Sequence, residues 1–263
     1  MDERSNYYWG FIMEILADFP ENWIDLQNKV ADVLSGCGYI VETPKIVKTV
    51  RGKVELDVYA QNESMKIICE CKYWEQNVSQ NTIFALRTIM QDTGANRGIV
   101  IAKKGFQSGA YENSRSTNIE LYKWEEFQNL LKDKYLKNRI KRYLAIKSKL
   151  FRIADNKSEY LKYYDLLNPR EQQEANALQD DLMKLVLTLS PMCSMLQYED
   201  DAEIGWDIMQ IDVLISKAEQ TFNRTFLSYA DFFNYVRSEI ITTIGKIEKL
   251  YKVELVSERA QNW

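Results

Sequence analysis

Three charged residues on two neighbouring predicted strands could carry out hydrolytic chemistry together. The stretch VELDVYAQNESMKIICECKYW, residues 54–74, predicts two strands joined by a polar turn. Asp57 lies on the first strand, and Glu70 and Lys72 share one side of the second. Two carboxylates held close together repel each other, and a divalent cation relieves that repulsion. A cation that activates water, with a lysine beside it, meets the chemical needs of phosphodiester hydrolysis.

The spacing alone has a second interpretation, in which Asp57, Glu70 and Lys72 form ion pairs at the protein surface on an edge strand. Glu55, two residues before Asp57, is either a further carboxylate of the site or an exposed strand residue. Tyr73 and Trp74 directly follow the second strand. Their rings could stack on nucleic-acid bases, or they could be buried against a helix.

The composition excludes several classes of active site. The 263 residues include no histidine, so histidine-based triads, H-E-x-x-H peptidases and His-ligated metal sites are ruled out. Of the four cysteines only Cys69 and Cys71 are close together, and we expect reduced core thiols rather than a zinc site. The net charge of −4 gives no overall basic signature, so any nucleic-acid surface must be local.

Nothing in the sequence predicts a membrane protein. No apolar run approaches the ~18 residues of a membrane-spanning helix. The start, MDERSNYYW, lacks the basic and apolar regions of a signal peptide. We therefore expect a cytoplasmic protein with no membrane partner.

Periodicity predicts an α/β region followed by an all-helical one. The first region holds helices and strands in the order of a mixed sheet flanked by helices, with a fully apolar strand at 98–102 that suits a buried, parallel position. Its expected helices are 23–35, capped by Asn22, then 79–93 and 106–114, with another beginning near Trp124. The expected helices of the second region are 158–166, 169–189, 208–222 and 228–250, interrupted at Pro191 and at the acidic run 199–201.

The stretch 132–152 predicts a basic helix. It carries nine lysines and arginines against the single acid Asp133. Such a face is either simply solvated or a phosphate-binding surface. The cations that we consider for nucleic-acid binding lie here and in the loop after the apolar strand: Lys103, Lys104, Lys137, Arg139, Lys141 and Arg142.

Several separated motifs resemble, in the same order, the Mrr-like branch of the PD-(D/E)xK restriction-endonuclease superfamily. They are the segments LQNKVADVLSGCGYIVE, VELDVYA, IICECKYW, TGANRGIVIAKKGFQSGAYENS and NIELY. The resemblance covers about residues 23–128. It implies a restriction-endonuclease-like fold, followed here by the all-helical region, with domain bounds of 1–131 for the nuclease domain, 132–157 for a basic helical linker and 158–263 for a helical domain of unknown role.

The resemblance also implies roles for individual residues. Asp57 and Glu70 would ligate Mg²⁺ or Mn²⁺, the backbone carbonyl of Cys71 would complete the metal shell, and Lys72 would be the catalytic lysine. Many relatives place a glutamate on the first helix where this chain has Gln27, so that ligand is either dispensable or partly replaced by Glu55. From its own helix, Gln27 is expected at the surface.

A supporting polar role is a further prediction for Gln80, at the start of the helix after the second strand. The function expected from the resemblance is a Mg²⁺-dependent endonuclease that hydrolyses DNA, in restriction or anti-phage defence. The partners expected are DNA, and a second copy of the chain, as in a dimer, or a defence complex. The alternatives are a nucleic-acid-binding or assembly module with weak or lost catalysis, and a nuclease that acts on RNA or on modified DNA only.

Overall fold

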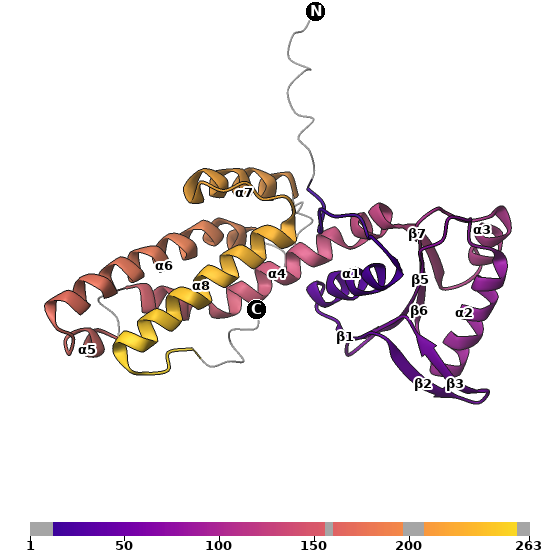
Figure 1. The fold of residues 1–263 in the computed structure, drawn as a ribbon, viewed down its shortest axis with the longest axis horizontal. Helices are drawn as coiled ribbons and strands as arrows, with labels where there is room; N and C mark the ends of the chain where they lie inside the picture. Colours follow the sequence, from indigo (N-terminus) through magenta and orange to yellow (C-terminus); the bar gives the residue numbers. More distant parts are fainter. Residues whose placement is uncertain (1–12, 156–159, 197–207, 257–263) are drawn as a thin grey trace, which may run out of the picture. The chain divides into compact units, whose positions relative to one another are not determined.

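The computed structural model of the protein describes residues 13–155, 160–196 and 208–256 (Figure 1). Contacts among these residues form two compact units, Ile15–Arg139 on the one hand and the described residues of 140–256 with 13 and 14 on the other. The division falls inside one helix, α4, which runs from Trp124 to Ala154. We retain the bounds 1–131, 132–157 and 158–263 as a proposal about domains.

The first unit is built on a mixed five-stranded sheet with the order β1-β4-β5-β6-β7, which confirms the predicted fold class. The strands β1, β4 and β5 are antiparallel neighbours, whereas β5, β6 and β7 are parallel. Their bounds are β1 Ile40–Glu42, β4 Val58–Gln61, β5 Lys66–Lys72, β6 Arg97–Ala102 and β7 Ile119–Lys123. The apolar strand β6 lies between two parallel neighbours, as its sequence predicted.

Helices cover both faces of this sheet. Helix α1, Trp23–Gly36, packs on β4 and β5, while α2, Gln80–Thr93, and α3, Ser108–Ser114, lie on the other side (Figure 1). On that second face a buried cluster joins the strands to α2, and it includes Ile68, Ile83, Leu86 and Val100. The two helices therefore sandwich the strand that carries Glu70 and Lys72.

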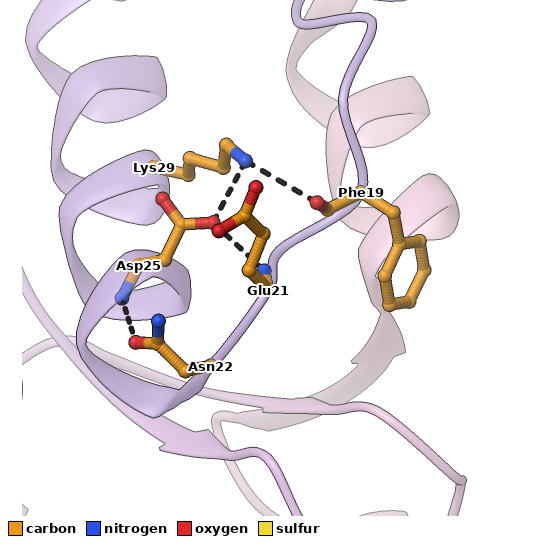
Figure 2. Close-up of polar contacts among 5 residues, drawn as sticks. All are labelled: Phe19, Glu21, Asn22, Asp25 and Lys29. Carbon is orange, nitrogen blue, oxygen red and sulfur yellow. Dashed lines mark hydrogen bonds and ion pairs between the residues drawn. The ribbon is translucent and has the colours of Figure 1, made fainter.

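The start of α1 is fixed by a group of local polar contacts (Figure 2). The Asn22 side chain accepts a hydrogen bond from the Asp25 N–H at 3.0 Å, which confirms the predicted N-cap. The Asp25 carboxylate accepts from Lys29 and from the Glu21 N–H, both at 2.8 Å. These contacts set where the helix begins, and so which of its residues face the sheet.

A two-stranded antiparallel hairpin stands apart from the main sheet. It consists of β2, Lys45–Thr49, and β3, Gly52–Leu56. The prediction of one continuous strand through Asp57 was therefore wrong, because β3 ends at Leu56 and β4 begins at Val58. The Asp57 carboxylate accepts the Cys71 N–H in place of a backbone carbonyl, so the β4–β5 ladder ends at the pair Val58 and Cys69.

The second unit is helical, as predicted. Its helices after α4 are α5 Leu161–Tyr164, α6 Pro169–Leu196, α7 Ile208–Phe222 and α8 Tyr229–Tyr251, and α6 packs against both α7 and α8 (Figure 1). The buried Gln179 amide donates to the Ile153 carbonyl at 3.2 Å and to the Tyr251 hydroxyl at 3.1 Å. One side chain thus ties together three of the helices, α4, α6 and α8.

Two helix predictions were wrong in detail. Pro191 lies inside α6 rather than interrupting it, and the fully buried Met192 and Cys193 pack the turn that follows the proline. The basic stretch is not a separate helix, because α4 runs without a break from Trp124. The acidic run 199–201 lies outside the described residues.

Among the described residues, no helix combines the length and apolar character needed to span a bilayer.

Candidate active site

Glu70 and Lys72 lie near the carboxyl end of β5, next to the buried strand β6. Their side chains alternate with the buried Cys71 and share one side of the strand. The Lys72 ammonium forms an ion pair and hydrogen bond with the Glu70 carboxylate. Both side chains are mostly covered, with 17% of Lys72 and 21% of Glu70 exposed, so a small molecule or a phosphate can still reach them.

Asp57 reaches β5 from the break between β3 and β4. One carboxylate oxygen, Oδ2, accepts the backbone N–H of Cys71 at 2.7 Å, and the other, Oδ1, accepts the side-chain amide of Gln27 at 2.7 Å. The Asp57 carbonyl accepts from the Thr43 hydroxyl at 2.8 Å. Because Cys71 lies between Glu70 and Lys72, these bonds hold the Asp57 carboxylate beside the other two charged groups.

Gln27 occupies a different place from the one predicted for it. Only 6% of its surface is exposed, and it donates to Asp57 from the face of α1 that packs on the sheet. The expectation of a helix-surface residue was wrong because Gln27 lies directly beside the buried Leu26 and faces the polar end of the strands. Thr43 was missed altogether, and a lone threonine before a proline gave no signal.

Glu55 is not brought into this group. It lies on β3 opposite Ile46, it is exposed, and none of the described contacts joins it to Asp57 or Glu70. The predicted two-residue spacing fails because the chain leaves β3 before Asp57, so Glu55 and Asp57 do not share a strand.

The backbone N–H and carbonyl of Cys71 point toward the side of β5 on which Asp57 lies. The Lys72 carbonyl accepts the Lys103 N–H at 2.9 Å on the side of β6. Backbone polar groups of successive strand residues point to opposite neighbours, so the Cys71 carbonyl points to the side of β4. Its N–H does so as well, as the bond to Asp57 shows. The Cys71 thiol is buried, which raises its pKa well above the ordinary value and leaves it protonated.

The electrostatics of the group favour a bound cation. Burial raises the pKa of Glu70, the negative charge of Asp57 raises it further, and Lys72 opposes both effects. Two carboxylates and one ammonium leave this half-buried group with a net negative charge when all three are ionised. A divalent cation would relieve the cost of keeping Glu70 ionised.

The donor atoms fit a hard divalent ion. Within the described ranges, no three His, Cys, Asp or Glu side chains gather closely enough to form a metal cluster. The group instead offers two carboxylates and, from Cys71, a backbone carbonyl. Oxygen donors of this kind suit Mg²⁺ or Mn²⁺, which keep several water ligands, better than Zn²⁺. Gln27 could present its own amide oxygen after a half-turn of the amide group.

Gln80 lies outside this group. It is the first residue of α2, it is exposed, and its amide oxygen accepts from Asn113 of α3 at 3.3 Å. No described contact links it to Asp57, Glu70 or Lys72, so any supporting role remains a prediction.

Aromatic and basic side chains lie close to the end of β5. The Lys72 ammonium is 4.9 Å from the centre of the Trp74 ring, and Trp74 is 48% exposed rather than buried against a helix. Lys103 lies 4.4 Å from the Tyr73 ring centre and forms an ion pair with Glu75. Lys104 is exposed.

The cations of α4 are divided between structural contacts and the surface. Lys132 is buried, and Lys134 donates to the Tyr39 hydroxyl at 2.5 Å. Lys137 forms an ion pair with Asp133, and Arg139 donates to the Tyr135 hydroxyl at 3.2 Å. Lys141 is exposed and Arg142 is partly exposed. The helix is therefore not a uniform basic face, and its role in nucleic-acid binding stays a prediction.

Comparison with known proteins supports the resemblance found in the sequence. Residues 21–131 match the family model Mrr_cat, described as restriction endonuclease. A protein of unknown function is similar in structure, with a TM-score of 0.38 and 15% identity over 61% of this chain and 98% of its own. A repair endonuclease from Pyrococcus abyssi is similar with a TM-score of 0.29 and 17% identity, over 42% of this chain and 50% of its own. No curated protein is similar enough to count as a match.

Proposed function

We propose that this protein is a metal-dependent nuclease that hydrolyses phosphodiester bonds of DNA. One observation carries the proposal: the Asp57 carboxylate, bonded to the Cys71 N–H, lies beside the Glu70–Lys72 ion pair. The match of residues 21–131 to a restriction-endonuclease family supports the same class of reaction.

The residues of the group would divide the work as follows. Asp57, Glu70 and the Cys71 carbonyl would hold Mg²⁺ or Mn²⁺, which when bound supplies Lewis acidity and a more acidic water. The two hydrogen bonds at Asp57 fix the orientation of its carboxylate before any ligand arrives. Lys72 would place its positive charge near the attacking water and the phosphate oxygens, where negative charge develops.

Cleavage of supercoiled plasmid DNA tests the proposal. We expect nicking with Mg²⁺ or Mn²⁺, and no nicking in EDTA. Asp57→Asn and Lys72→Met should each slow cleavage by roughly 10²-fold or more. Lys66→Met is the matched control, because Lys66 is exposed on the same strand. This variant should cleave DNA like wild type. Undiminished cleavage by Asp57→Asn or Lys72→Met would overturn the proposal.

A second candidate is a nucleic-acid-binding or assembly module with weak or lost catalysis. The observation in its favour is Gln27, an amide that donates to one carboxylate oxygen of Asp57 at the position where the family resemblance implies a glutamate. Calorimetric titration with Mn²⁺ separates the two candidates. A Mn²⁺ site that Asp57→Asn abolishes supports the nuclease, and the absence of such a site supports the module.

The substrate and the cellular setting are proposals from family resemblance. We place the protein in the cytoplasm, in restriction or anti-phage defence, as a dimer or as part of a defence complex. The plasmid assay, repeated with methylated DNA and with RNA, compares the substrates. Sedimentation of the purified chain measures its oligomeric state.

A further inference from the structure

The β2–β3 hairpin carries an unbalanced positive charge. Its residues 45–56, KIVKTVRGKVEL, include four cations and one acid, Glu55, in a chain whose net charge is −4. Two of the cations have acidic neighbours, since Lys45 lies 2.6 Å from Glu42 and Arg51 lies 4.0 Å from Asp92. Lys48 and Lys53 are exposed, and neither takes part in any described ion pair. Glu55, two residues from Lys53 on the same strand, is exposed and takes part in no described ion pair either, so the hairpin presents two cations against one acid at these positions.

Lys48 and Lys53 also stand directly opposite each other. The antiparallel register pairs Lys48 with Lys53, between the pairs Val47–Val54 and Thr49–Gly52. Like charges in this position repel and destabilise a hairpin. Their side chains point away from the core, because the alternating Val47 and Val54 are partly buried against it. Stability therefore does not explain this pair, whereas an anion that both ammonium groups contact would offset the repulsion.

The hairpin lies on the same face of the sheet as two of the proposed catalytic side chains. Val47 and Val54 pack against the cluster that contains Ile68. Ile68 in turn lies on the same side of β5 as Glu70 and Lys72. A polyanion that approaches this face to reach Lys72 would thus also meet the hairpin.

The distance along the chain between Lys53 and Asp57 is compatible with the spacing of phosphates in a nucleic acid. Lys53 precedes Asp57 by four residues, which spans at most about 14 Å of extended chain. Successive phosphates of one DNA strand advance about 3.4 Å along the helix axis, so this reach corresponds to roughly four nucleotides.

We propose that the β2–β3 hairpin binds the phosphate backbone of the nucleic-acid substrate through Lys48 and Lys53, a few nucleotides from the bond that is cleaved. The proposal rests on the proposed nuclease function and adds a contact surface to it. Phosphate contacts of this kind position a substrate without reading its sequence. The occupant is a nucleic acid rather than an acidic protein, because the hairpin runs directly into Asp57 of the proposed active site.

The test measures binding without cleavage, in the full chain. A fluorescent DNA duplex is titrated in EDTA at several salt concentrations, with wild type and with the double variant Lys48→Gln/Lys53→Gln. Losing two phosphate contacts should reduce the slope of log K against log salt by about 1.8 and weaken binding roughly 60-fold near 0.1 M salt. The control is Lys246→Gln/Lys249→Gln, which removes the same charge from exposed positions of α8 and should bind like wild type.

The outcomes separate this proposal from the nuclease assignment. The melting temperature of the hairpin variant should equal or exceed that of wild type, because a repulsive pair is lost, so weak binding by a stable variant supports the proposal. An unchanged slope, equal losses in the α8 control, or no DNA binding by wild type would each overturn it. A reduced slope together with a wild type that never cleaves would support the hairpin contact and count against the nuclease.

Discussion

The substitution Gln27→Glu would place a third carboxylate in the proposed site. The present amide donates to Asp57 at 2.7 Å from a position that is 6% exposed. A glutamate there would lose the donated hydrogen bond and place a second negative charge against Asp57. We expect the metal-free protein to be less stable and the metal-bound protein to gain a ligand.

The size of the effect follows from these contacts. A hydrogen bond to a charged group contributes about 1.5–3 kcal/mol. Two like charges about 4 Å apart add up to roughly 4 kcal/mol at an effective dielectric constant near 20, and protonation of one carboxylate limits this cost. We therefore expect a loss of at least about 2 kcal/mol, or roughly 4–8 °C in melting temperature.

Thermal melts in EDTA and in Mn²⁺ provide the assay. Gln27→Leu is the matched control, since it removes the hydrogen bond without adding charge. Gln27→Glu should melt lowest of the three proteins in EDTA and should show the largest upward shift with Mn²⁺. A Gln27→Glu protein as stable as wild type in EDTA, with a Mn²⁺ shift no larger than that of Gln27→Leu, would refute this reasoning.

Three further predictions concern the same unit. Lys72→Met, which should slow cleavage, should nevertheless bind Mn²⁺ more tightly in a calorimetric titration, because the ammonium no longer competes for Glu70; weaker binding would contradict this. Glu70→Gln should raise the melting temperature of the metal-free protein at neutral pH. Because the pKa of Glu70 is raised in the folded protein, ionisation of Glu70 destabilises the wild type as pH rises through that pKa, whereas the glutamine variant cannot ionise. The melting temperatures of wild type and Glu70→Gln should therefore be equal below the ordinary glutamate pKa and should differ above it. Gly36→Ala should cost about 1–3 kcal/mol in denaturant unfolding, because a Cβ there would lie 2.1 Å from the buried Tyr135 ring; an unchanged midpoint would argue against that packing.

Strong local patterns made part of the structure predictable. The apolar stripe of α2 ends at Gly94 in the left-handed conformation, and the unbroken apolar run of β6 indicated its buried position. Asp57, Glu70 and Lys72 were predicted as site residues because their motifs follow one another in the order of a known family, and this role stays a prediction.

Features that depend on tertiary contacts could not be predicted. Alternation of apolar residues continues from Val54 to Val58 and hides the break at Asp57, which is made by a side chain that takes a backbone hydrogen bond. Gln27 borders the apolar stripe of α1, so its position depends on how that helix docks on the sheet. The continuity of α4, in contrast, is consistent with its sequence, since no glycine or proline occurs between Trp124 and Ala154.

Diffraction from a crystal soaked in Mn²⁺ tests the central claim most directly, because anomalous scattering locates the ion itself. The account predicts one strong peak bordered by the carboxylates of Asp57 and Glu70 and the carbonyl of Cys71, at metal–oxygen distances of about 2.1 Å. Soaked crystals with no peak at this place, or with an ion bound by neither carboxylate, would contradict it.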